Sequence, residues 1–193
     1  MATHKGTQII QTERLLLRPF RMDDARAMHK NWASDPDVTK FLTWPTHESP
    51  DVSRLVLTEW TANYEKPDYY QWAIELRDLQ QPIGSIAVVE QDDEIGKSHL
   101  GYCIGKAWWH QGIATEALQA VISFLFREVG MHRIEARHDV NNPHSGMVMQ
   151  KCGLVFEGIH RQSDRNNQGI CDAAWYAILA EEWLQREDDP YDI

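Results

Sequence analysis

The sequence lacks several features that mark common classes of protein. Only three of its 193 residues are cysteines (Cys103, Cys152 and Cys171) and no CxxC pair occurs, so no disulfide framework is indicated. The first ten residues contain no apolar signal-peptide core, and no run of about 18 apolar residues is present to span a bilayer. We therefore expect a reduced, cytoplasmic protein with no membrane partner.

Basic residues are also in short supply. Lys and Arg together number 19 against 29 Asp and Glu, which gives a formal charge of −10. A general nucleic-acid binder needs a basic face for phosphates, so we expect no direct nucleic-acid partner. The negative charge favours the approach of amine-bearing molecules, weakly and at long range, but solubility is the simpler explanation for it.

Motifs for metal and common nucleotide chemistry are missing as well. His132, His138, His144 and His160 are scattered, and neither HExxH nor a Cys/His pair with zinc spacing occurs, so we expect no metal. The chain has no GxGxxG, and no GK[ST] follows the glycine at 112, which argues against a Rossmann fingerprint and a Walker loop there.

The remaining pattern predicts one α+β (mixed α/β) domain over residues 1–193, with mobile tails at about 1–11 and 186–193. Alternating apolar residues predict a strand in each of seven segments: 13–20, 69–76, 82–90, 98–105, 132–140, 154–162 and the start of 172–184, whose end is predicted to be helical. The second to fourth of these strands follow one another closely, as in an antiparallel meander. Residues 35–45, broken by two prolines, are predicted to be loop.

Helices are predicted at 21–34, 49–64, 142–153 and from Gly112 to a C-cap at Gly130. The first should bury Ala25, Met28 and Trp32. The second has Ser49 at its N-cap and Pro50 at its first position, with an apolar face made of Val52, Leu55, Val56 and Trp60.

The stretch WWHQGIATEALQAVISFLF (108–126) places a glycine where an amphipathic helix begins. Unpaired main-chain N–H groups at a helix start, together with the helix dipole, favour an anion such as a phosphate. Gly112 lets a bulky anion approach the main chain because no Cβ stands in the way. A tight strand-to-helix turn explains this glycine equally well when it is considered by itself.

A second segment, NNPHSGMVMQKCGLVFEG (141–158), reads as a short helix with an N-cap at Asn142 and a stop at Gly153, followed by a strand. The two segments in this order, together with TERLLLRPF (12–20), resemble the GNAT superfamily of acetyl-CoA-dependent N-acetyltransferases. The likeness extends over about residues 12 to 184 and is greatest to the branch that includes the ribosomal-protein-alanine N-acetyltransferases. It implies a twisted, mostly antiparallel sheet of about seven strands flanked by helices.

The resemblance also implies how acetyl-CoA binds as a co-substrate. The loop WHQGIA would wrap the CoA diphosphate with main-chain amides; it consists of Trp109, His110, Gln111, Gly112, Ile113 and Ala114. The strand at Tyr102, Cys103 and Ile104 would pair with the pantetheine arm. Asn142 would bond the arm from the other side. Trp109 departs from the Gln or Arg of the broad superfamily pattern, and Gln111 brings no positive charge.

Catalysis then requires a holder for the oxyanion, a proton donor for sulfur and a proton acceptor for the amine. A main-chain N–H near Ile104 would hold the oxyanion. The resemblance implies Ser145, which also lies close to the CoA sulfur, as general acid and Asp164 as base, while Glu90 and His99 are alternatives for the base. A polar residue in a first helical turn and a solvated turn aspartate are the competing interpretations of Ser145 and Asp164.

We expect an N-acetyltransferase that acts by direct attack in a ternary complex on a primary amine, first of all a protein N-terminus. A polyamine, an aminoglycoside or a lysine side chain is the alternative acceptor. A non-catalytic acyl-CoA-binding module and a phosphate-binding protein unrelated to CoA are the alternative classes. The acceptor would contact the loops at 36–50 and 162–170. Three tryptophans either line the acceptor site or pack in the core: Trp44, Trp72 and Trp108. The sequence is compatible with a monomer or a homodimer.

Overall fold

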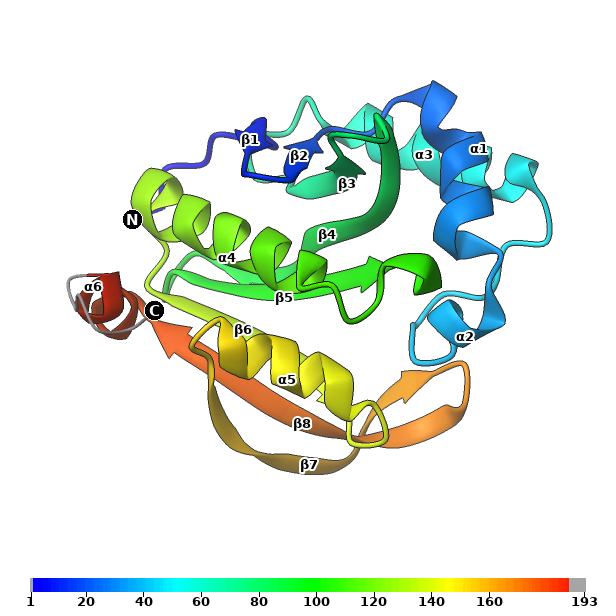
Figure 1. Cartoon of the computed structure of the whole chain (residues 1–193). Coiled ribbons are helices and arrows are strands. Elements are labelled where there is room, and N and C mark those ends of the chain that lie inside the picture. The colour runs from blue at the N-terminus through cyan, green and yellow to red at the C-terminus, as the bar shows by residue number, and fades with distance from the viewer. Residues whose placement is uncertain (1, 188–193) are drawn as a thin grey trace.

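A computed structural model describes residues 2–187, in which eight strands form one sheet (Figure 1). The order is β1-β2-β3-β4-β5-β6-β8-β7, and each neighbouring pair is antiparallel except β5–β6. The strands are β1 (Ile10–Gln11), β2 (Leu15–Arg18), β3 (Gln71–Leu76), β4 (Gln81–Asp92), β5 (Lys97–Ile104), β6 (Arg133–Asp139), β7 (Val155–Asn166) and β8 (Gly169–Leu179). This arrangement confirms the predicted α+β class and adds the short β1 to the seven expected strands.

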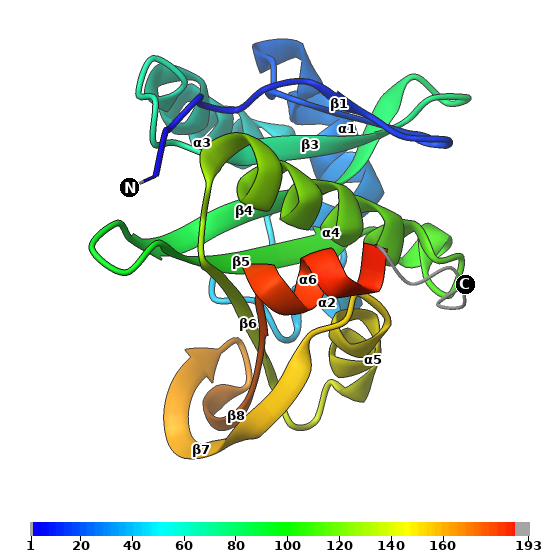
Figure 2. The same ribbon diagram turned by 90° about the vertical axis from the view of Figure 1, so that its left-hand side faces the viewer.

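The helices lie on both faces of the sheet (Figures 1 and 2). Six α-helices are present in the described range: α1 (Ala25–Met28), α2 (Pro36–Thr39), α3 (Pro50–Asn63), α4 (Ile113–Phe124), α5 (Pro143–Lys151) and α6 (Ala180–Glu187). α1 lies between a 3-10 turn (Met22–Asp24) and a π turn (His29–Ala33), and α4 continues into a second π turn (Leu125–Val129). Gly130 ends that turn with a left-handed φ of 79°, as its predicted C-cap role requires.

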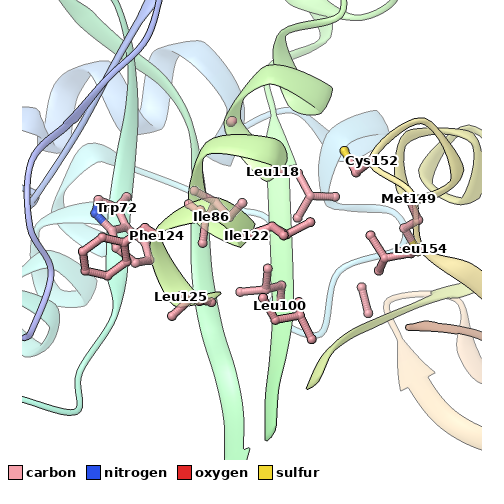
Figure 3. Packing of buried hydrophobic residues seen from close by; sticks show 14 of the residues in the cluster. Trp72, Ile86, Leu100, Leu118, Ile122, Phe124, Leu125, Met149, Cys152 and Leu154 are labelled. Carbon is pink, nitrogen blue, oxygen red and sulfur yellow. The ribbon is translucent and has the colours of Figure 1, made fainter. Parts of the chain in front are cut away.

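The main core lies between the sheet and α4 (Figure 3). The apolar stripe predicted for this helix is buried, including Leu118, Ile122 and Leu125, and it packs with Trp72 and Leu100 of the sheet. Burial of each leucine or isoleucine stabilises the fold by about 1.5–3 kcal/mol. Trp72 is therefore a core residue.

A second cluster covers the opposite face of the sheet. It contains Trp32 from the turn after α1, Leu57 from α3 and Ala73 from β3, with Cys103 of β5 packed against it. Because successive side chains of a strand point to opposite faces, Leu100 and Ile104 of β5 face α4, whereas Cys103 faces α1 and α3.

Two local predictions are wrong. Residues 35–45 are not all loop, because Asp35 accepts a hydrogen bond from the main-chain N–H of Asp37 at 2.9 Å and thereby caps the short α2. In α3, Leu55 is 72% exposed instead of buried, and the stripe of Ser53 and Leu57 is turned toward the core. Ser53 can be buried because its hydroxyl lies 2.8 Å from Nδ1 of His47.

The two predicted N-caps are at their positions without side-chain capping bonds. This holds for Ser49 before α3 and for Asn142 before α5. Of the tails expected to be mobile, residues 188–193 lie outside the described residues. In the tail at 1–11, Thr3 donates its N–H to the carbonyl of Val129 at 2.7 Å, and Ile10–Gln11 pairs with β2. These contacts do not measure motion, and the mobility of this tail stays a prediction.

The parallel pair β5–β6 is short, and this shapes the site. Among the described residues the two strands pair only over three positions, ending at His99 opposite Glu135. β6 continues along β8 as far as Asp139, whereas β5 continues along β4 to Ile104. The two strands part toward the N-terminal ends of α4 and α5 (Figure 1). We call this divergence, between residues 100–104 and 136–139, the wedge.

Candidate active site

The loop before α4 has the backbone that an anion site needs. After β5 the chain makes a 3-10 turn (Lys106–Trp108), and Gly112 becomes the N-cap of α4 with a left-handed φ of 75°. His110 also has a positive φ, 60°, which is uncommon for a residue with a Cβ. Trp109 fastens the loop to the end of β5, because its indole N–H donates to the carbonyl of Ile104 at 2.9 Å.

The main-chain N–H groups of this loop are available to a ligand. The hydrogen bonds formed within residues 2–187 include none donated by the main-chain N–H groups of 110–114, and the first bond of α4 runs from Glu116 N–H to the carbonyl of Gly112 at 3.0 Å. A Cβ added at Gly112 would meet only one atom within 4 Å, the Nη2 of Arg14 at 3.6 Å, so the main chain is open at this point. Exposed donors at a helix start and open space beside them fit a diphosphate.

Side-chain bonds from Arg14 brace this loop, and no sequence motif indicated them. Arg14 donates from Nη1 to the carbonyl of Gln111 at 2.8 Å and from Nε to Glu116 at 2.6 Å. Thr12 also donates to Glu116, at 2.6 Å. Burial raises the pKa of Glu116, but the hydrogen bonds from Thr12 and Arg14 outweigh this and hold it below its usual value. The ionised carboxylate thus fixes Arg14 against the loop.

Residues of the two predicted motifs meet beside this loop. The ring of His110 lies 5.0 Å from that of His144, centroid to centroid, and the latter belongs to the first turn of α5. Asn142, at the start of the same helix, makes no side-chain capping bond and can therefore serve a ligand. Within the loop, Ile113 is buried in the core, Ala114 is half-buried, and Gln111 is exposed.

Tyr102 connects β5 to α5 at the wedge. Its hydroxyl donates to the carbonyl of Ser145 at 2.9 Å and lies 3.0 Å from the Oγ of the same residue. Burial is the main cause that raises the pKa of Tyr102, so the phenol stays protonated at neutral pH. The predicted acid Ser145 and the predicted pantetheine strand are therefore in contact on the α4 and α5 side of the sheet.

The three predicted candidates for the base come together around a residue that the sequence did not single out, Arg137 of β6. Its Nε donates to Asp164 at 2.7 Å, its Nη1 donates to Glu90 at 3.2 Å, and the same Nη1 lies 3.4 Å from Nε2 of His99. The guanidinium lies over the ring of Trp175, 5.1 Å from its centroid. We call these five residues the Arg137 cluster.

The cluster lies on the face of the sheet opposite Tyr102 and Ser145. His99 alternates with Leu100 and Tyr102 along β5, so it points away from α4. It is only 3% exposed, and its burial, followed by the charge of Arg137, lowers its pKa and keeps the imidazole neutral. Its Nδ1 lies 3.5 Å from the carboxylate of Glu135. Burial raises the pKa of Glu135, but the hydrogen bonds from Arg133 and Lys97 outweigh burial and leave that pKa below its usual value. Glu135 is thus an ionised carboxylate beside a neutral imidazole.

The two loops expected to meet the acceptor contact each other. Asn167, in the turn between β7 and β8, donates from Nδ2 to the carbonyls of Thr39 and Trp44 at 2.8 and 2.7 Å. Its main-chain N–H donates to the carbonyl of Leu42 at 3.1 Å. Trp44 is half-buried against the second core cluster, while Trp108 packs against the main core.

Two further observations concern metals and membranes. Across residues 2–187, His, Cys, Asp and Glu side chains nowhere gather in groups of three or more that could hold a metal ion. In that same part of the chain, no helix is both long and apolar enough to pass through a bilayer.

Comparison with known proteins agrees with this geometry. A family model described as "Acetyltransferase (GNAT) domain" matches residues 14–155. The uncharacterized N-acetyltransferase YnaD of Bacillus subtilis (strain 168) is 31% identical over 174 residues, which cover 90% of this chain and 98% of that protein. The crystal structure of a GNAT-family acetyltransferase from Bacillus anthracis superposes with a TM-score of 0.79 at 27% identity, covering 90% of this chain and 99% of the other.

A shorter match concerns the ribosomal branch. The ribosomal protein uS5-alanine N-acetyltransferase of Escherichia coli (strain K12) is 38% identical over 60 residues, which cover 31% of each chain. The matched domain and the relative aligned over nearly its whole length are decisive for the family. The chain belongs to the GNAT family of acetyl-CoA-dependent N-acetyltransferases.

Proposed function

We propose that this enzyme transfers the acetyl group of acetyl-CoA to the α-amine of a polypeptide N-terminus. The observation that carries the proposal is the two-sided wedge: the CoA loop, Tyr102 and Ser145 lie on one face of the sheet, and the Arg137 cluster lies on the other. An extended N-terminus can enter from the second face while the thioester enters from the first. The local similarity to the E. coli uS5-alanine enzyme supports an α-amine acceptor.

The cofactor side follows from the free main-chain groups. The amides of 110–114 hold the diphosphate, with Trp109 fixing the loop and Gly112 giving clearance. The part of β5 formed by Tyr102, Cys103 and Ile104 has β4 on one side only, so its other edge can pair with pantetheine as an added strand would. Asn142 bonds the arm from the α5 side.

The chemistry is one direct displacement. The neutral amine attacks the thioester carbonyl carbon, a C–N bond forms, the C–S bond breaks, and CoA leaves as its thiol. A main-chain N–H of β5 near Ile104 holds the oxyanion, and Ser145 gives its hydroxyl proton to sulfur. Asp164 of the Arg137 cluster accepts the proton that the amine loses. Proximity of the two bound reactants supplies a large share of the rate.

The α-amine suits this arrangement by its acidity. An N-terminal amine has an ordinary pKa of about 7.7–8.0, so a substantial fraction is already neutral near pH 7, whereas a lysine amine at about 10.4 is almost entirely charged. After attack, the nitrogen of the adduct is far more acidic than the free ammonium. A weak base such as a carboxylate is then sufficient to remove its proton.

The test is thiol release from acetyl-CoA, with mass spectrometry to locate the new acetyl group. Two matched peptides carry the comparison: one has a free N-terminal Ala or Ser and no lysine, and the other has a blocked N-terminus and one lysine. We expect acetylation of the first only. Acetylation of the second, or of a polyamine or aminoglycoside in preference to both, would contradict the proposed acceptor. Binding of acetyl-CoA without release on any amine would indicate a non-catalytic module instead.

A further inference from the structure

Arg137 contacts residues of three other strands of the sheet. It belongs to β6, Glu90 to β4, His99 to β5, and Asp164 to β7. β8 lies between β6 and β7, so Arg137 must reach across it, and it does so over the indole of Trp175. The guanidinium and the carboxylate of Asp164 are each only about a fifth to a quarter exposed, 21% and 25%. A guanidinium fixed by an aromatic face and a 2.7 Å bond sets the position of its partner.

The backbone of β7 is irregular at the same place. The register of β7 against β8 shifts between His160 and Asp164: residues 161–163 of β7 lie opposite the single residue Asp172 of β8, so β7 has two extra residues there. A bulge of this kind redirects the side chain that follows it. Asp164 then pairs opposite Cys171, and its Oδ1 also accepts the N–H of Arg165 at 2.8 Å. Without Arg137, this carboxylate would have no side-chain partner recorded among residues 2–187 to hold it toward the wedge.

The cluster also contains a buried polar atom that makes no hydrogen bond within residues 2–187, Nε1 of Trp175. Nδ1 of His99 is buried as well, and its contact with the carboxylate of Glu135 is long, 3.5 Å. Buried polar groups in folded proteins are paired in the great majority of cases. An unpaired indole N–H beside His99, the last β5 residue paired with β6, is typical of a place that a polar ligand completes.

We propose that Arg137 is the positioning residue for proton removal: it holds the carboxylate of Asp164 at the acceptor face of the wedge. This inference rests on the proposed function. Burial lowers the pKa of Arg137, but its bonds with Asp164 and Glu90 more than offset this and leave the pKa raised. The guanidinium therefore stays charged, and its charge-assisted hydrogen bond fixes the direction in which the carboxylate points.

Other charged and titratable groups lie near this ion pair. Glu90 accepts a hydrogen bond from Nη1 of Arg137, and Cys171 is paired opposite Asp164 on β8. Burial together with Asp139 raises the pKa of the Cys171 thiol to about 11, so that thiol is uncharged at neutral pH. Arg137 is the cation that bonds Asp164 directly, so its removal should leave the carboxylate without the bond that fixes its position.

The experiment is a double-mutant cycle with Arg137→Gln, Asp164→Asn and the two combined, measured as kcat/KM for a peptide over a range of pH. We expect Asp164→Asn to lower kcat by roughly 10²-fold, as loss of a positioned base does. Arg137→Gln should lower kcat by roughly tenfold and shift the acidic limb of the profile, because the charge beside Asp164 is lost. The double variant should be no slower than Asp164→Asn, because both changes act on one step.

A matched control is available on the same strands. Arg133 of β6 bonds Glu157 of β7 at 2.8 Å through Nη1, which is a second bridge across β8 away from the wedge. Glu157→Gln removes that bridge and should keep the wild-type pH profile. Arg137→Lys, which restores the charge, should recover part of the lost rate, and the dissociation constant for acetyl-CoA should stay near wild type in every variant. If Arg137→Gln does not fold, Arg137→Lys takes its place in the cycle.

Multiplicative effects in the double variant, or an unmoved acidic limb in Arg137→Gln, would overturn the inference and leave the acetyltransferase standing. If Glu157→Gln changed kcat and the pH profile as much as Arg137→Gln does, the bond between Arg137 and Asp164 would have only a structural role. A wild-type enzyme that acetylates no amine would overturn the proposed function and this inference with it.

Discussion

Gly112 provides the most direct perturbation of the cofactor loop. We consider Gly112→Ala. With φ at 75°, an alanine pays about 1–2 kcal/mol of strain in the left-handed region. The added methyl has only Arg14 within 4 Å on the protein side, so it points into the space in front of the free amides. If it prevents one hydrogen bond to the charged diphosphate, worth about 1.5–3 kcal/mol, acetyl-CoA affinity falls about 10- to 100-fold.

Gly130 gives the control, because it ends the same helical segment with nearly the same φ, 79°, and a Cβ there would meet nothing within 4 Å. Gly130→Ala should cost similar stability and leave acetyl-CoA affinity unchanged. Titration calorimetry measures both affinities, and thermal unfolding measures both stabilities. S-acetylpantetheine, which lacks the diphosphate, should bind wild type and Gly112→Ala equally. Unchanged acetyl-CoA binding by Gly112→Ala, or an equal loss in Gly130→Ala, would refute the reasoning.

Three further predictions concern the acid, a buried ion pair and pH. Ser145→Ala should lower kcat roughly 10²-fold with little change in acetyl-CoA affinity, and wild-type turnover in a thiol-release assay would reject its role as acid. Arg18 is 4% exposed and bonded to Asp24 and Glu75 at 2.7 Å, so Arg18→Met takes the guanidinium from the buried carboxylate of Asp24, which keeps the N–H of Arg21, and from the half-buried carboxylate of Glu75. Denaturant unfolding should show a loss of about 3–5 kcal/mol, and a loss under 1 kcal/mol would contradict this. Burial lowers the pKa of His47 from 6.5, so the unfolded chain binds a proton that the folded one does not, and stability falls as pH drops below about 6.5. His47→Gln should lose less stability than wild type between about pH 7.5 and about pH 5.5, and an equal loss would show that this group is not responsible.

The sequence predicts the backbone of the loop before α4 well because its determinants are local. Gly112 is needed where a strand turns into a helix, and the left-handed φ that it adopts is a property of that single residue. Gly130 is similar, and the helix between them is defined by its 3.6-residue period. The helix that begins after Asn142 was predicted from neighbouring residues in the same way, although the side chain of Asn142 makes no capping hydrogen bond.

The acceptor side could not be predicted in this way because its contacts are long-range. Arg137 meets Glu90 and Asp164 over 47 and 27 residues, through a register that includes an irregularity in β7. No period or motif encodes such a meeting. The brace from Arg14 to Glu116 spans 102 residues and was missed for the same reason. Leu55 was misplaced because the apolar stripe of a helix does not show which neighbouring residue faces the core, and Ser53 is buried through its contact with His47, which lies in the loop before α3.

The role of the loop at 109–114 is tested most directly by a crystal structure of the protein with CoA. We predict that diphosphate oxygens lie within about 3.2 Å of main-chain nitrogens between His110 and Ala114, with the pantetheine arm running along β5 into the wedge. A diphosphate bound elsewhere, or a loop whose amides turn away from it, would contradict the account.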